Sequence, residues 1–351
     1  MSGGPGLEQR YRRVLRLLPG YYRDKWEEDM VAAFLDSWLT GDPDDDVAIL
    51  EFCKPTSGEI ASVAGLAARL YLGGAGAPRR YFAWGQAVRR AVLAVTLVQA
   101  VRGLDVLVRT AWSRHEFGWL PAPPAGIAPG TPGGIVPPTV WYLVAYAWIA
   151  TFVALVLGRY RTAQVIAALA IVPDLIWLLQ GELAGAFQGP SLGTWAFWVL
   201  LNLAPVLAMS AFHADAPPVA RWPWLLALPA NYLLVAVPLM VLQATGNSAW
   251  LPDFSGLYCV LAALACLTYA PRAWSRPPAG SGVWSLALTL LAADAAAYRI
   301  FSLTEYLHDP HLIQVSLAEL LILVIAVALL APDAARAHTA APAPPSHPRP
   351  G

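Results

Sequence analysis

Residues 312–331, LIQVSLAELLILVIAVALLA, decide the class of fold. Glu319 is the only charged residue in this run. Because an α-helix rises about 1.5 Å per residue, about 20 apolar residues are enough to cross the hydrocarbon core of a bilayer. The run therefore predicts a transmembrane helix.

Seven more apolar runs of similar length precede it along the chain. They cover residues 88–108, 139–157, 162–180, 194–212, 222–243, 254–270 and 282–301. Tryptophans stand near many of their ends, as expected where aromatic rings meet lipid headgroups. We expect an all-α fold, a polytopic helical membrane protein of about eight transmembrane helices with a small N-terminal cytosolic helical module.

The distribution of charge agrees with this division. Charged residues make up 24 of the first 90 positions but only 22 of the other 261, far fewer than a water-facing surface needs. The formal net charge is zero, which excludes the basic footprint of a nucleic-acid-binding protein. We expect a cytosolic three-helix module at 1–80, a transmembrane bundle at 81–331 and a disordered Ala/Pro-rich tail at 332–351.

The orientation follows from the arginines and lysines. With the N-terminus in the cytosol, 19 of the 23 Lys and Arg residues lie inside, and only Arg109 and Arg114 lie outside. This predicts a multi-pass protein of the cell (inner or plasma) membrane with both termini cytoplasmic. The strong preference for Arg over Lys, with abundant Ala and Pro, indicates a GC-rich bacterial genome, of the actinobacterial type.

Polar residues within the apolar runs are the main functional signal, since an ionisable group in hydrocarbon costs several kcal/mol and usually faces the bundle interior. The candidate intramembrane site comprises Arg102, Asp105, Asp174, Asn202, Asn231, Asp294, Arg299 and Glu319. Arg102 and Asp105 are spaced to pair along one helix, whereas Asp294 and Arg299 need partners elsewhere. Two interpretations stay open: buried ion pairs that fix helix register, or a ligand or proton site.

The N-terminal segment predicts helices at residues 7–18, 21–39 and 56–72, the last with a Thr56–Glu59 capping box. We expect a solvated turn at 41–46, whose aspartates lack the spacing of a calcium loop. The charged surface of the first two helices is the candidate partner-docking region. It comprises Arg12, Arg13, Arg16, Arg23, Glu28, Asp29 and Met30.

The chain contains no recognisable catalytic motif, so we expect no enzymatic activity, cofactor or metal. A loop with Glu305, His308 and His311 has the residue types of a zinc site, but we expect a solvated loop there. The expected partners are the lipid bilayer and, through residues 1–80, a cytosolic regulator or another membrane protein; no nucleic acid is expected.

One segment resembles a known module. YRRVLRLLP at 11–19, YR at 22–23, EDM at 28–30 and FLD at 34–36 resemble the helical prefix that precedes the spans of many bacterial membrane proteins. Examples are the prefix domain of ABC-type permeases and the HAAS signalling domain that accompanies PadR-type regulators. The match covers about 30 of the 351 residues and departs from the pattern at Glu27, where glycine is usual. The resemblance implies a cytosolic interaction or signalling role.

Two functional hypotheses follow. The first is a signalling, regulatory or scaffold component whose N-terminal helices dock a cytosolic partner. The second is a secondary transporter of a small cation or a proton-coupled solute, based on the intramembrane acids and the nearby prolines Pro173, Pro205 and Pro229.

Overall fold

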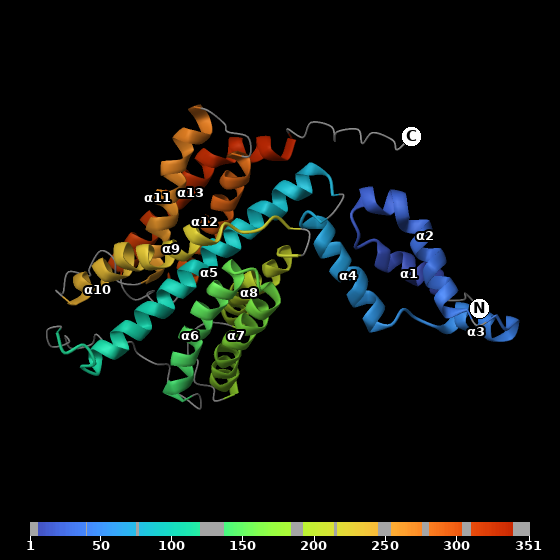
Figure 1. Cartoon of the computed structure of the whole chain (residues 1–351), viewed down its shortest axis with the longest axis horizontal. Helices are drawn as coiled ribbons and strands as arrows, with labels where there is room; N and C mark the ends of the chain where they lie inside the picture. Colours follow the sequence, from blue (N-terminus) through green and yellow to red (C-terminus); the bar gives the residue numbers. More distant parts are fainter. Residues whose placement is uncertain are drawn as a thin grey trace. The chain divides into compact units, whose positions relative to one another are not determined.

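The computed structural model describes residues 6–39, 41–74, 77–119, 137–183, 192–213, 216–244, 254–275, 281–303 and 310–339. Every regular element in these ranges is a helix (Figure 1). The chain divides into two compact units, one containing Met1–Gly85 and the other Gln86–Ala343.

The first unit is a small helical module with its own core. Its helices are α1 (Leu7–Leu15), α2 (Gly20–Trp38), α3 (Pro43–Phe52) and α4 (Ser57–Tyr71). Tyr11 of α1 stacks on Phe34 of α2, with ring centroids 3.8 Å apart. The apolar stripes of α1, α2 and α4 supply the other buried side chains: Leu7, Leu15, Leu18, Val31, Val63, Ala67 and Leu70.

The segment expected to be a turn at 41–46 instead begins helix α3, so the first unit has four described helices where three were expected. Pro43 suits the first helical position because its missing N–H would have no intrahelical partner there. The aspartates that follow lie in the first turn, where negative charge favours the helix dipole. The expected capping box is confirmed: the Glu59 amide donates to Thr56 Oγ1 at 3.2 Å, and the Thr56 amide donates to Glu59 Oε2 at 2.6 Å.

The second unit contains helices that overlap each of the eight predicted apolar runs, although the run at 222–243 is divided between two short helices. They are α5 (Arg79–Ser113, which begins in the first unit), α6 (Pro138–Val156), α7 (Tyr160–Leu183), α8 (Leu192–Ala208), α9 (Arg221–Asn231), α10 (Val237–Ala244), α11 (Phe254–Ser275), α12 (Ser281–Leu303) and α13 (Pro310–Thr339). A π-helical turn, Tyr232–Ala236, joins α9 to α10. Of the described helices, α5, α6, α11, α12 and α13 are long and apolar enough to cross a membrane. The chain thus has the architecture of a helical membrane protein.

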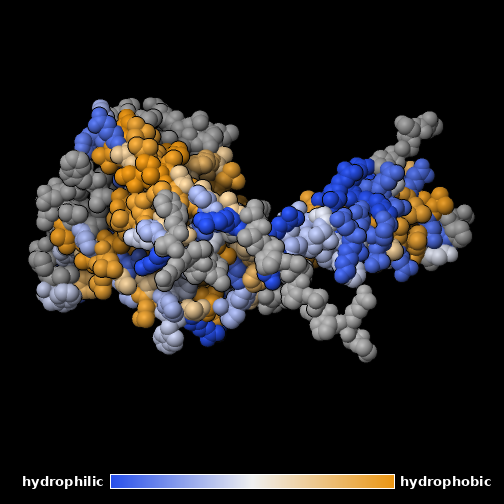
Figure 2. Space-filling model, turned by 90° about the horizontal axis from the view of Figure 1, so that it is seen from above, coloured by the Kyte–Doolittle hydropathy of each residue, from blue (hydrophilic) through white to orange (hydrophobic). Residues whose placement is uncertain are grey.

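The outward face of the second unit is apolar. Figure 2 shows hydrophobic side chains over much of the surface in view, whereas the N-terminal helices are mostly hydrophilic there. Leu317, Leu321 and Val324, on one side of α13, are each more than half exposed. Leu143 of α6 and Leu234 of the π-helical turn are exposed in the same way. Such a surface suits contact with lipid chains and would be poorly soluble in water.

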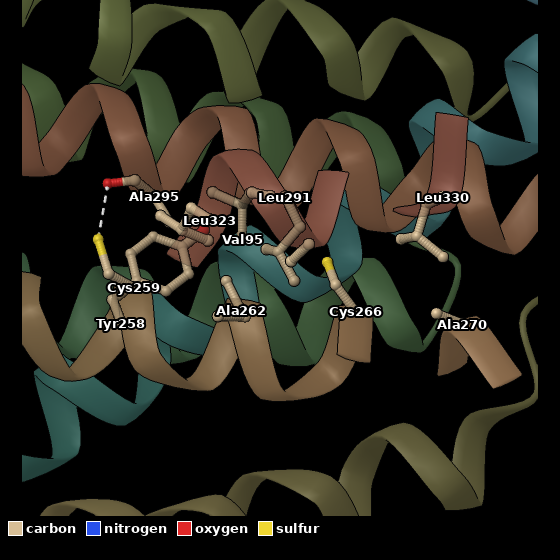
Figure 3. Close-up of a cluster of buried hydrophobic side chains, with 13 residues drawn as sticks. Val95, Tyr258, Cys259, Ala262, Cys266, Ala270, Leu291, Ala295, Leu323 and Leu330 are labelled. Carbon is tan, nitrogen blue, oxygen red and sulfur yellow. Dashed lines mark hydrogen bonds between the residues drawn. The ribbon is translucent and has the colours of Figure 1, made fainter. Parts of the chain in front are cut away.

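Helices α11, α12 and α13 pack closely through small side chains, and α5 contributes Val95 to the same cluster (Figure 3). The Cys259 thiol of α11 donates to the Ala295 carbonyl of α12 at 3.4 Å, and the Cys266 thiol, farther along α11, donates to the Leu288 carbonyl at 3.8 Å. Small residues allow helix backbones to approach, which is the main source of packing energy between helices in lipid.

Helix α5 also approaches α6 at Gly103. A Cβ added to Gly103 would lie 2.6 Å from the carbonyl oxygen of Ala145, closer than real Cβ atoms come to any neighbour. Only glycine therefore fits this crossing without a shift of one helix.

Helix α13 continues beyond the expected end of the bundle. We expected a disordered tail from residue 332, but residues 332–339 belong to the helix, with Pro332 inside it. Asp333 is buried and accepts a hydrogen bond of 2.5 Å from the Ser285 hydroxyl of α12, which ties this extension to the bundle. Residues 340–351 lie outside the described part of the chain.

Candidate polar site among the apolar helices

The site is built around two side chains on one face of α12. Asp294 and Tyr298 are four residues apart, so they lie one above the other on the helix. Tyr258 of α11 donates a hydrogen bond of 2.9 Å to Asp294 Oδ2. The rings of Tyr258 and Tyr298 meet edge to face, with centroids 6.3 Å apart. The Asp294 carboxylate, the Tyr258 phenol and the Tyr298 ring therefore form one connected group of side chains.

The Tyr298 hydroxyl connects three helices. It accepts a hydrogen bond of 2.7 Å from Gln99 Nε2 of α5 and donates one of 3.0 Å to Asn202 Oδ1 of α8. Gln99 and Asn202 are both buried. We call the five residues Gln99, Asn202, Tyr258, Asp294 and Tyr298 the Tyr298 network.

Two charged side chains outside this network, Arg102 and Asp174, act electrostatically on the Tyr298 hydroxyl. Arg102 lies one turn beyond Gln99 on α5, and its charge acts on Asp105, on Asp174 of α7 and on the Tyr298 hydroxyl. In the described part of the chain, neither Arg102 nor Asp174 has a hydrogen-bonded or ion-paired partner. The prolines expected near Asp174 and Asn202, Pro173 and Pro205, lie inside α7 and α8.

Three of the candidate residues, Asp105, Arg299 and Glu319, form ion pairs apart from the network. Asp105 binds Arg109 within α5 at 2.7 Å, so the expected pairing of Asp105 with Arg102 is replaced by the i,i+4 pair. Arg109 becomes available because α5 runs to Ser113, where the sequence suggested an external loop.

Arg299 Nε of α12 contacts Glu319 Oε2 of α13 at 2.6 Å, and the two side chains are 0% and 6% exposed. Arg299 follows Tyr298, and one residue turns a helix by about 100°. The guanidinium consequently faces α13 while Tyr298 faces α5 and α8. Asp294 and Arg299 do use partners on other helices, as their spacing requires.

The last candidate, Asn231, stands apart from these contacts. Its side-chain amide donates to the Ala227 carbonyl one turn earlier at 2.8 Å, at the end of α9 where the π-helical turn begins. The bond lies within one helical turn and includes Pro229 of α9 between its two residues.

Sequence reasoning missed Gln99, Tyr258 and Tyr298. Tyrosine is grouped with the hydrophobic residues in the composition, and neutral glutamine gives no charge signal. One available signal was that Tyr258 and Tyr298 lie inside predicted apolar runs, because a buried tyrosine hydroxyl normally needs a hydrogen-bond partner. A second was spacing, with Gln99 three residues before Arg102 and Tyr298 four after Asp294.

The predicted docking residues of the first unit are only partly accessible. Arg12 is held by Glu8 at 2.9 Å and by Glu28 at 2.7 Å, so it joins α1 to α2. The Arg12 hydrogen bond lowers the pKa of Glu28 below its ordinary value. The remaining predicted residues divide by burial: Arg13, Arg16 and Asp29 are exposed, Arg23 is half-buried, and Met30 packs against the core.

The arrangement offers a carboxylate, two phenols and two amides in apolar surroundings. These groups can bind a proton or a small cation. In the described ranges, no three His, Cys, Asp or Glu side chains gather as a metal site would require. Glu305 and His308 of the histidine loop lie outside those ranges. No protein-family model, curated protein or solved structure matches the chain.

Proposed function

We propose that the chain is a multi-pass protein of a bacterial plasma membrane that crosses it eight times, with both termini in the cytosol. In this proposal the N-terminal unit docks a regulatory partner, and the spans anchor it and sense the membrane environment. The observation that carries the proposal is the separate core of the first unit, which gives a folded, charged module in front of an apolar bundle.

The exposed surface of α1 is the favoured contact. Arg13, Arg16 and Leu17 are all exposed, although Leu17 is apolar. An apolar side chain flanked by free arginines suits a partner with an acidic, partly apolar surface. The resemblance of residues 11–36 to prefix modules also supports an interaction role.

A photo-crosslinking experiment on the full chain in membranes tests this proposal. A benzophenone residue in place of Leu17 should capture a partner, and Arg13→Glu with Arg16→Glu should abolish capture by reversing the charge. Lys54→Glu, an exposed cation elsewhere in the unit, is the matched control and should leave capture intact. Equal capture by the double variant would reject docking through α1.

A second candidate function, transport of a small cation or a proton-coupled solute, is favoured by the Tyr298 network. Its members come from α5, α8, α11 and α12, so a change in their packing could expose Asp294 alternately to either side. Asp294→Asn and Asp174→Asn should then abolish ion or proton flux in proteoliposomes. Flux equal to that of the unmodified chain would reject a role for these acids in transport.

A further inference from the structure

Two adjacent arginines stand where the apolar part of α5 begins. Arg89 is only 3% exposed, and its Nη1 makes one long hydrogen bond of 3.4 Å to the Ala211 carbonyl in the 3-10 turn Met209–Ala211 that follows α8. Its Nε and Nη2 atoms are buried without a hydrogen-bond partner among the described residues. A guanidinium has five N–H donors, so most of the Arg89 donors are unused.

Arg90 lies beside it in a similar state. Its guanidinium stacks over the ring of Trp284 in α12, 4.4 Å from the centroid. Its buried Nη1 has no described hydrogen-bond partner. The groups that act on the two arginines are each other and the Tyr269 phenol, and no described carboxylate pairs with either.

One described acid, Asp333, acts on the same Tyr269 phenol as Arg90 but forms no ion pair with either arginine. Asp333 accepts a hydrogen bond from the Ser285 hydroxyl, next to Trp284 in sequence, and lies 3.9 Å from Arg336. Arginine stays protonated under all ordinary conditions, and a buried charge without a counter-charge costs several kcal/mol. Two such charges side by side repel each other as well. The site therefore needs an anion from outside the described chain.

The location indicates which anion. Arg89 and Arg90 lie at the very start of the apolar run 88–108, so they lie at the depth of the headgroups if α5 crosses a bilayer. Trp284 is the residue type that gathers at this depth. Basic pockets between helices at a membrane face bind the phosphates of anionic lipids, and the arginine fork matches phosphate oxygens in pairs.

We propose that Arg89 and Arg90, with Trp284 as a wall, form a binding site for the phosphate group of an anionic phospholipid. The lipid phosphate neutralises both guanidiniums and occupies the free Nε and Nη donors. The site is independent of partner docking through α1 and of the Tyr298 network, and it makes the packing of α5, α8 and α12 depend on lipid composition.

Thermal unfolding of the full chain in detergent tests the proposal. Added phosphatidylglycerol or cardiolipin should raise Tm by about 3 °C or more, and phosphatidylcholine should not, because a ligand stabilises only the state that binds it. Arg89→Gln and Arg90→Gln should each lose this rise. Arg159→Gln, an exposed arginine just before α7, is the matched control and should keep it.

For each variant, the measured quantity is the difference between its Tm with and without lipid. A variant whose Tm is already altered without lipid can therefore still be compared with the unmodified chain. Native mass spectrometry of the same samples should show retained anionic lipid for the unmodified chain and loss of it for both variants. An equal rise in Tm for Arg89→Gln would overturn the site. An equal rise in Tm with inorganic phosphate alone would show that the site binds a soluble anion and would overturn the assignment to a lipid. Asp215, which lies outside the described residues, could supply the counter-charge from within the chain. A double-mutant cycle of Arg89→Gln and Asp215→Asn that shows coupling in Tm would overturn the proposal.

Discussion

Tyr258 of α11 donates a hydrogen bond of 2.9 Å to Asp294 of α12, and the two helices also share the small-residue core. The neighbours of Tyr258 in that core include Cys259 and Ala262, one and four residues farther along α11. Residues of the polar site and residues of the small-residue core therefore alternate along the same two helices, α11 and α12. Substitutions in the site should change stability as well as any activity, and experiments have to separate the two effects.

Tyr258→Phe should lower the stability of the bundle by about 0.6–2 kcal/mol, the range measured for single hydrogen bonds between helices in membranes. The substitution removes the donor to Asp294 but keeps the aromatic volume. Thermal unfolding in detergent measures the effect. Tyr146→Phe, at an exposed site on α6, is the control and should leave Tm unchanged. Equal effects at both sites would contradict a role for the Tyr258 hydroxyl.

Glu319→Gln should destabilise the bundle by about 3–5 kcal/mol, since it removes the carboxylate charge that pairs with the fully buried Arg299. The double variant Arg299→Met with Glu319→Leu should recover much of that loss because it removes both charges together. Unfolding by heat or denaturant in detergent compares the three chains. A double variant as unstable as Glu319→Gln would show that the pair does more than neutralise charge.

Gly103→Ala should destabilise the packing of α5 on α6 by about 1–3 kcal/mol, the usual cost of overfilling a packed interface. The added Cβ would lie 2.6 Å from the Ala145 carbonyl oxygen. Gly65→Ala in α4 is the matched control, because nothing lies within 4 Å of the added Cβ. There the higher helix propensity of alanine should stabilise α4 by up to about 1 kcal/mol. Local hydrogen exchange resolves the two helices, and a harmless Gly103→Ala would contradict the close crossing.

The first unit should lose stability in acid through Glu59. Burial raises the pKa of Glu59, but hydrogen bonds from the Thr56 amide, the Trp38 indole and the Thr56 hydroxyl outweigh it, so the pKa lies below its ordinary value of 4.5. A lowered pKa in the folded state stabilises the fold above the unfolded value, and the gain is lost as pH falls through the folded value. Trp38 fluorescence and hydrogen exchange in α4 should therefore change below about pH 4.5.

Glu59→Gln should remove most of this pH dependence, because glutamine does not titrate in that range. Glu51→Gln, at an exposed site at the end of α3, should preserve it. Unchanged acid sensitivity in Glu59→Gln would assign the transition to another carboxylate.

The positions of the helices could be predicted because length and hydropathy determine them. Each predicted run overlaps at least one helix, but the run at 222–243 is divided among α9, the π-helical turn and α10. Other ends differ where polar residues continue a helix beyond the apolar window. Helix α5 starts at Arg79 and includes Arg109 for this reason. Helix α3 was missed because an aspartate-rich start resembles a turn, although proline and acidic residues also suit the first turn of a helix.

The site could be predicted only in part, because its residues come from helices whose neighbours the sequence does not specify. Asp294 and Asn202 were identified as polar groups in apolar runs, and Tyr298 connects Asn202 to the other helices. No periodicity shows that α12 lies beside α8 or that Tyr298 meets Gln99. The same limit explains Asp105, for which two arginines stand at suitable spacing and only the backbone course of α5 selects Arg109.

We propose that the chain from α5 onward is embedded in a bilayer, and membrane fractionation can show whether it is. After lysis and an alkaline carbonate wash, the full chain should stay in the membrane pellet and enter solution only with detergent. A compact, stable monomer in a detergent-free extract would contradict the account.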